Sequence, residues 1–501
     1  MPHHEGRQFS RGATCGGVRS LPQIRVVRTA RTLSSLLALH CAAGALAQDA
    51  PHYELRLDAN GSDVAVRICL DRMHDEVRFA ADSGVAIKYL RDVRRDHDGT
   101  LAAAEDGWNA IDWRAGECLS YHADLDAITA THDTDTGWRI GDDRAAAPQL
   151  LLLRPDVQGD ADAGASVSLP EGWSFSAPWH RIGDAGIGAH YEIPNTPPDW
   201  SANVAFGHFT ERRMEQPGGA LRVSILHGPD ADQEKKLHAW LDHVTKAVLS
   251  AYGRLPLADV QVLVIPLHSR RGAVMFGQSI RGQGNALEIL VDASRPASEF
   301  DDDWIAVHEL SHLMHPYLGD RGSWVAEGLA TYYQNILRAR SGMLTAAQGW
   351  DRLREGFSDN DGRRYDEALA DAARAMHRTH DFQRIYWSGA AFWLTVDRDL
   401  RRDSGDKLSL DLALSRFRDC CLPAYRGWTP EDFVAKLDVL LDTKTFSQRY
   451  HEFAVLRRFP EWKGVFEDLG IRDGGERLHF DANARDASVR DAIMTAPKPV
   501  D

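Results

Sequence analysis

The segment WIAVHELSHLMHP, residues 304–316, contains residue types that bind catalytic metal ions and transfer protons. His308 and His312 are four residues apart, so on a helix their imidazoles project from one face and can reach one zinc ion. Glu309 is displaced around the helix, close to the metal without binding it, as a general base must be. The spacing predicts hydrolysis by metal-activated water. The alternative is a set of polar residues on a buried helix.

A catalytic zinc site also needs a third protein ligand and one open position. Glu327 lies in the apolar run WVAEGLATYY, where burial of a carboxylate is costly unless the carboxylate binds a cation. A helix, a turn and an antiparallel helix would return Glu327 to His308 and His312, although it could instead be a surface residue of an amphipathic helix. His315 precedes Pro316, where the helix ends, so we expect it beside the ligands rather than on the metal.

The hydrophobic pattern predicts the elements that position these residues. Apolar residues at helical spacing predict a helix over 232–253, and apolar runs predict strands over 260–266 and 286–293. The next helix should begin near the acidic residues 301–303 and end at or just before Pro316.

The helix that contains Glu327 should follow directly. Ser323 is a plausible N-cap for it, and Gly342 is a plausible end. Beyond this helix the pattern is mostly helical to about Leu469.

At the level of domains, the sequence predicts an α+β multidomain protein. Short alternating runs bounded by turn residues predict an N-terminal antiparallel β domain over 48–220. We expect the catalytic domain over 221–345, a helical C-terminal part over 346–480 and a loose tail over 481–501.

The N-terminal 47 residues have the pattern of a signal peptide. Arg25, Arg28 and Arg31 precede a short apolar run that ends in the small-x-small site Ala45-Leu46-Ala47. We therefore expect export to the periplasm or the medium, with no stable membrane anchor after cleavage. A disordered cytoplasmic extension is the alternative.

Charge narrows the class of partner. The formal net charge is −15, and removal of residues 1–47, with six Arg and one Glu, leaves 52 basic and 72 acidic residues, a net charge of −20. Such an acidic chain is a poor binder of nucleic acid or anionic membrane, so we expect neither as a partner.

Four cysteines follow the predicted cleavage site, and none has metal-ligand spacing. Cys69 and Cys118 could form a disulfide in an oxidising compartment, whereas Cys420 and Cys421 are adjacent and too close for an easy mutual bridge.

The sequence HELSH followed by WVAEGLATYY resembles the gluzincin metallopeptidases. It is most similar to the glycyl aminopeptidase family over about residues 232–469, and more distantly to the alanyl aminopeptidase and leukotriene A4 hydrolase family. The resemblance implies a thermolysin-like catalytic domain behind an N-terminal β domain, and one catalytic Zn²⁺. It assigns His308, His312 and Glu327 as zinc ligands and Glu309 as the general base.

The resemblance also implies a tyrosine that stabilises the oxyanion of the tetrahedral intermediate. Tyr386, in RIYWSGAAF, matches this residue, with a tyrosine packed at a helix start as the alternative. Thr331, one turn after Glu327, could hydrogen-bond the ligand carboxylate. Glu288, in GQGNALEI, could match the glutamate that binds the substrate's free amine in aminopeptidases, or could be a solvent-facing strand residue.

The sequence departs from the family in three respects. The residues LMHPY that follow HELSH lack the Trp common there. The amine-binding motif is incomplete, and we expect no PDZ domain after Leu469. The prediction is an exported zinc peptidase, most similar to aminopeptidases, with a peptide lying as an added strand along FGQSIRGQGNALEILV. An endopeptidase of the same clan and a non-catalytic peptide-binding module are the alternatives.

Overall fold

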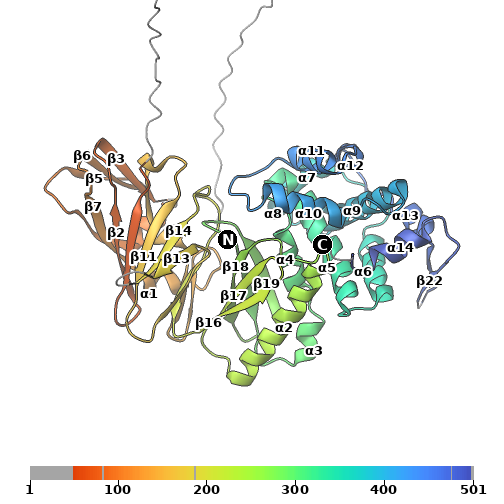
Figure 1. Cartoon of the computed structure of the whole chain (residues 1–501), viewed down its shortest axis with the longest axis horizontal. Helices are drawn as coiled ribbons and strands as arrows, with labels where there is room; N and C mark the ends of the chain where they lie inside the picture. Colours follow the sequence, from red (N-terminus) through yellow and green to blue (C-terminus); the bar gives the residue numbers. More distant parts are fainter. Residues whose placement is uncertain (1–48, 82–83, 185–187, 476, 498–501) are drawn as a thin grey trace, which may run out of the picture. The chain divides into compact units, whose positions relative to one another are not determined.

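The computed structural model describes residues 49–81, 84–184, 188–475 and 477–497. The predicted signal peptide lies outside these residues. The expected fold class is confirmed, because a strand-rich N-terminal region, a central α+β region and a series of helices follow one another along the chain (Figure 1). Among the described residues no helix has both the length and the apolar character needed to cross a membrane.

The described N-terminal region contains three sheets. Their strand orders are β13-β14-β11-β1-β2-β7-β4, β10-β3-β6-β5 and β12-β15-β9-β8. Neighbouring strands are antiparallel, as predicted, except for the parallel pair β1–β11. The strands are β1 (His52–Leu57), β2 (Asp63–Cys69), β3 (His74–Ala81), β4 (Leu90–Arg95), β5 (Leu101–Ala104), β6 (Gly107–Trp113), β7 (Cys118–Asp124), β8 (Gly137–Ile140), β9 (Asp143–Ala146), β10 (Leu153–Pro155), β11 (Ala163–Ser168), β12 (Ser174–Ser176), β13 (His180–Asp184), β14 (Ala189–Ile193) and β15 (Val204–Gly207).

All four cysteines of the described chain are paired. Cys69 on β2 and Cys118 on β7 are register partners and form the expected disulfide. Cys420 and Cys421 are also joined, so the expectation that these neighbours do not bridge is wrong in this structure. The pair lies at the last two positions of a helix, where the chain leaves regular geometry.

The central sheet has the strand order β16-β17-β18-β20-β19. Its strands are β16 (Glu211–Gln216), β17 (Gly219–Ile225), β18 (Asp259–Pro266), β19 (Val274–Ile280) and β20 (Ala286–Val291). β17, β18 and β20 are parallel, and β19 is an antiparallel edge strand. The domain boundary expected at residue 220 falls inside β17, so this sheet begins at the β16–β17 hairpin.

The two faces of this sheet have different neighbours. On β20, Leu287 and Ile289 belong to the core formed with helix α2 (Ala231–Leu249) and the later helices, whereas Leu290 packs against the N-terminal sheets. Asp230 and Gln233 form a capping box that starts α2. The sheet is therefore buried on both faces, which explains its nearly continuous apolar strands.

Two short helices and a long one follow the sheet. They are α3 (Ala297–Asp301), α4 (Ile305–His312) and α5 (Ser323–Ser341). α4 ends four residues before Pro316, within the predicted limit. Ser323 is the first helical residue of α5, so the prediction that it is the N-cap is wrong by one position. The N-cap is Gly322, and no side chain caps this end of the helix. α5 ends at Ser341, and Gly342 is its C-cap, with a φ of 86° that suits glycine, as predicted.

The C-terminal part is mainly helical. Its elements are α6 (Ala346–Ser358), α7 (Leu369–Arg374), α8 (Met376–Thr379), α9 (Phe382–Ser404), α10 (Leu410–Cys421), α11 (Pro430–Leu441), α12 (Thr445–Ala454), α13 (Lys463–Asp468), β21 (Ile471–Asp473), β22 (Leu478–Phe480) and α14 (Ala487–Ile493). The expected loose tail is wrong for α14, because Val489 and Ile493 are buried in the main core. The Arg490 side chain also donates to two backbone carbonyls of the preceding segment.

Helices α5 and α9 cross at a pair of glycines. A Cβ atom added to Gly328 would overlap the backbone of Gly389, and one added to Gly389 would overlap Gly328 and the Trp324 carbonyl oxygen. Each glycine is close in sequence to a residue of the predicted site. Glu327 directly precedes Gly328, and Tyr386 is three residues before Gly389. The contact therefore fixes the separation of the two helices at the position where both carry site residues.

Substitution of Gly328 or Gly389 by alanine should push the two helices apart. Overpacking of this kind costs about 1–3 kcal/mol, so thermal unfolding should shift clearly to lower temperature. Gly464→Ala is the matched control, since Gly464 lies within α13 with open space around it. Alanine there should leave the unfolding temperature unchanged or raise it slightly. Equal unfolding temperatures for all three variants would show that the crossing is not tightly packed.

Candidate metal centre

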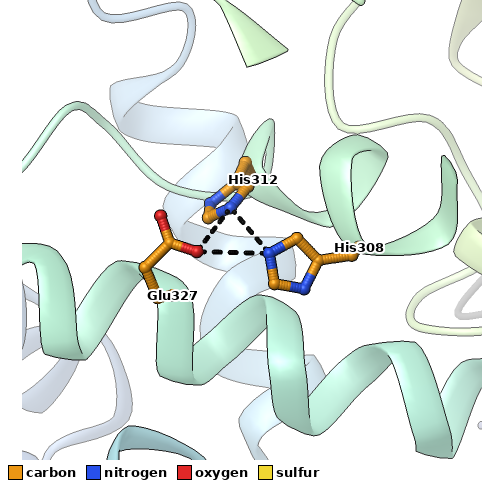
Figure 2. A group of neighbouring side chains, drawn as sticks. All are labelled: His308, His312 and Glu327. Carbon is orange, nitrogen blue, oxygen red and sulfur yellow. Dashed lines mark hydrogen bonds and ion pairs between the residues drawn. The ribbon is translucent and has the colours of Figure 1, made fainter. Parts of the chain in front are cut away.

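Three side chains from two helices converge on one point (Figure 2). The Nε2 atoms of His308 and His312 on α4 are 3.3 Å apart. Glu327 Oε2 on α5 lies 3.2 Å from His308 Nε2 and 3.4 Å from His312 Nε2. The structure thus brings the three predicted ligands together, as the turn between antiparallel helices suggested.

These separations fit a zinc ion. Nitrogen and oxygen ligands about 2.0–2.1 Å from a tetrahedral zinc are separated from one another by about 3.3–3.4 Å. Two imidazoles and one carboxylate are also a donor set that zinc prefers in catalytic sites. Within the part of the chain that the structure describes, His308, His312 and Glu327 are the one group of three His, Cys, Asp or Glu side chains close enough to share an ion.

The second nitrogen of each histidine is held by a neighbouring group. His308 Nδ1 lies 2.7 Å from Gln334 Oε1, an acceptor, so Nδ1 carries the proton and Nε2 has a free lone pair. His312 Nδ1 lies 3.0 Å from His315 Nε2, and His315 Nδ1 lies 2.7 Å from the Pro316 carbonyl oxygen. Since that carbonyl must accept, the chain of bonds leaves His312 Nε2 free for the metal. His315 lies beside the ligands, as expected.

Glu309 is positioned by the edge strand β19. Its Oε2 accepts a 2.9 Å hydrogen bond from the backbone N–H of Ser279, and its own carbonyl oxygen accepts from the Ser279 hydroxyl. The glycine at position 277 permits this approach, because a Cβ there would lie 2.9 Å from Glu309 Cγ. Burial raises the pKa of the Glu309 carboxyl, although His312 and His308 oppose the shift. A raised pKa suits a group that accepts and returns a proton.

The electrostatics of Glu327 differ from those of Glu309. Burial tends to raise the pKa of the Glu327 carboxyl, but His312 and His308 outweigh burial and hold the pKa well below its usual value. The carboxylate is therefore ionised, as a metal ligand must be.

Tyr386 on α9 lies against the same group. Its ring stacks on His308 with centroids 5.7 Å apart and planes 7° apart. Burial, together with the Glu327 carboxylate, raises the pKa of its phenol above the usual value. The phenol is therefore protonated, which is the state required of a hydrogen-bond donor.

Glu288, a predicted site residue, lies away from the three ligands. Glu288 is fully buried, so the solvent-facing alternative is wrong, and it lies on the face of β20 opposite Leu287 and Ile289. There it accepts a hydrogen bond from Asn203, and burial raises its pKa to about 8. The amine-binding role is also not supported, because alternation along the strand directs this side chain away from α4.

Thr331 is buried near the site but does not bind Glu327. Its hydroxyl has no hydrogen-bond partner among the described residues, so the predicted contact is wrong in this structure. The Thr331 side chain instead lines a cavity of about 430 Å³ beside Gln334 and Tyr386. One turn along α5 moves the hydroxyl past the carboxylate rather than onto it.

Sequence reasoning missed three residues of the site. Gln334 follows Glu327 by seven residues, two helical turns, which is a usable signal for a shared face. Ser279 and Arg281 contact α4 from the edge strand β19 and the residue just after it, and only the tertiary arrangement reveals them.

Comparison with known proteins places this geometry in context. The sequence profile described as M61 glycyl aminopeptidase matches residues 306–390, which include most of α4, all of α5 to α8 and the first residues of α9. Among proteins of curated function, none matches the sequence.

Solved structures share the fold. An aminopeptidase N family protein from Idiomarina loihiensis has a TM-score of 0.65 at 13% identity, over 84% of this chain and 78% of that one. An M1 zinc metallopeptidase from Deinococcus radiodurans has a TM-score of 0.51 at 13% identity, over 83% and 95%. The resemblance to gluzincin peptidases is confirmed, and the fold of M1 zinc metallopeptidases combined with an M61 peptidase segment identifies this chain as a hydrolase of the peptidase class.

Proposed function

We propose that the protein is a zinc-dependent peptidase that hydrolyses peptide bonds with metal-activated water. The observation that carries this proposal is the convergence of His308, His312 and Glu327, with Glu309 held beside them by Ser279. A bound zinc ion would supply a Lewis acid and lower the pKa of a water molecule. The three ligands would hold it, with Gln334 and His315 fixing the histidine tautomers.

The chemistry of the remaining residues follows from their positions. Glu309 takes a proton from the attacking water and returns it to the leaving amine, for which its raised pKa is suited. Tyr386 donates its phenol hydrogen to the carbonyl oxygen on which negative charge develops. The two groups come from different elements. Glu309 is on α4 and is held by β19, whereas Tyr386 is on α9.

The edge strand β19 is the proposed binding surface for the peptide. One edge of β19 pairs with β20, and within the described chain its other edge has no strand partner. An extended peptide can pair with that edge as an additional strand, in reach of Glu309. Phe276, 41% exposed on this strand, offers apolar surface for a substrate side chain.

The M61 match and the aminopeptidase fold support an aminopeptidase-like activity. A related two-domain M1 zinc metallopeptidase variant, with a TM-score of 0.51, is described as bound to L-arginine, a free amino acid. The position of Glu288, directed away from α4, favours an endopeptidase of the same clan as the second candidate. A non-catalytic binding module is disfavoured, because the base and all three ligands are present.

We further propose that the protein is exported and acts on peptides or proteins outside the cytoplasm. The leader-like residues 1–47 and the pairing of all four later cysteines support this proposal. N-terminal sequencing of protein recovered from the periplasm or the medium should begin near Gln48. Recovery of an intact chain in the cytoplasm alone would contradict export.

Glu309→Gln should retain one zinc ion per chain and lose peptidase activity. Loss of a general base lowers kcat by about a hundred- to ten-thousandfold, while zinc content by metal analysis stays unchanged. Glu467→Gln, on the exposed face of α13, should behave as wild type. Absence of zinc from the wild-type protein, or full activity of Glu309→Gln, would refute the mechanism. Peptides with free and acetylated N-termini serve as substrates, and equal cleavage of both would identify an endopeptidase.

Tyr386→Phe should keep the ring stacked on His308 and remove only the hydroxyl. Loss of one donor to the oxyanion lowers kcat by about a hundred- to a thousandfold, with little change in KM or zinc content. Steady-state kinetics of the zinc-loaded variant test this. A raised KM with unchanged kcat would instead assign the phenol to ground-state binding.

A further inference from the structure

Arg281 is the one residue of the site whose charge the proposed reaction does not use. It follows directly after β19, and its Nη2 donates to the carbonyl oxygens of His312, at 2.5 Å, and His315, at 3.4 Å. These carbonyls lie at the C-terminal end of α4, where the helix dipole favours a cation. The guanidinium is therefore held next to a metal ligand by two backbone contacts.

No carboxylate of the described residues lies within ion-pair distance of Arg281, although Glu309 and Glu327 are near enough to act on its charge. Among the described residues no Asp or Glu forms an ion pair with it, and its Nε and Nη1 have no hydrogen-bond partner. Burial lowers the pKa of the guanidinium to about 10, with Glu309 and Glu327 acting in the opposite direction. The side chain is half-buried, and arginine in such positions is normally paired.

The location of Arg281 places this charge on the proposed path of the peptide. Ser279, whose N–H bonds Glu309, is two residues before Arg281, which follows the last residue of the ladder, so the proposed base and the Arg281 backbone are neighbours along this segment. A peptide that paired with β19 beside Glu309 and continued past Ile280 would approach Arg281. A guanidinium with free N–H groups can bind a carboxylate through two parallel hydrogen bonds.

We propose that Arg281 binds a carboxylate of the substrate, and so makes the enzyme prefer peptides with a negative charge near the cleaved bond. The carboxylate belongs to an acidic side chain or to the peptide's own C-terminus. This inference rests on the proposed peptidase function and names its substrate class.

A purely structural role for Arg281 makes a different prediction. If it only caps the carbonyls of α4, its loss should disturb His312 and reduce activity equally toward every peptide. If it binds substrate, its loss should act selectively on peptides that carry the carboxylate. The ratio of two rates measured on one variant separates these roles, because any general loss cancels.

The experiment measures kcat/KM for matched peptides that differ only in charge. One pair has Glu or Gln beside the cleaved bond, and another has a free or an amidated C-terminus, so the two pairs distinguish the sources of the carboxylate. The wild type should prefer the charged member of one pair by about ten- to a hundredfold, the range for a charge-assisted hydrogen bond. Arg281→Gln should reduce this ratio to near one.

Two further variants sharpen the result. Arg281→Lys should retain part of the preference, because it keeps the charge but loses the bidentate geometry. Arg271→Gln makes the same chemical change at an exposed position in the loop before β19, and should leave the ratio at its wild-type value. An equal ratio in wild type and Arg281→Gln, or an equal loss of both rates, overturns the proposal.

Failure of the proposed function would be recognised separately. If the wild type cleaves neither member of any pair, the peptidase function is refuted. Binding of the same peptides to the zinc-loaded Glu309→Gln variant, with and without Arg281→Gln, then decides the role of Arg281. Tighter binding of the charged member that is lost on removal of Arg281 supports the proposal, and identical affinities refute it.

Discussion

The approach of Glu327 Oε2 to the Nε2 atoms of His308 and His312 is the interaction on which the site depends. A half-buried carboxylate and two buried imidazoles at 3.2–3.4 Å form an arrangement that a cation stabilises. The surrounding residues maintain it. Gln334 and His315 fix the histidine tautomers, and Ser279 holds Glu309, the proposed base. The two helices that carry the ligands belong to one core with the central sheet, so the metal centre is part of the packing of the domain.

The helical part of the site could be predicted from the sequence because helical spacing is local. His308, His312 and Glu309 are fixed relative to one another by 3.6 residues per turn, and Glu327 required only the additional inference of an antiparallel helix. The structure places all four as expected. α14 was missed because its apolar residues are few, and their burial depends on the distant helix that they contact.

The strand residues were less predictable, since the face that a strand residue occupies depends on register. A single-residue difference turns Glu288 toward or away from α4, and the sequence around it resembles the amine-binding motif only in part. Arg281 had no local signal, because its partners are backbone carbonyls more than thirty residues later. Side-chain hydrogen bonds on a helix are also hard to predict. Thr331 lies one turn after Glu327, as expected, but its hydroxyl does not bond the carboxylate.

The crossing of Gly328 and Gly389 has a consequence for motion. Because backbone meets backbone there, no side chain can rotate to widen or narrow the gap between α5 and α9. The backbone segments that carry Glu327 and Tyr386 should therefore move as one rigid body. The spacing of the two helices that carry the proposed metal ligand and the proposed oxyanion donor should then persist until the helices themselves separate.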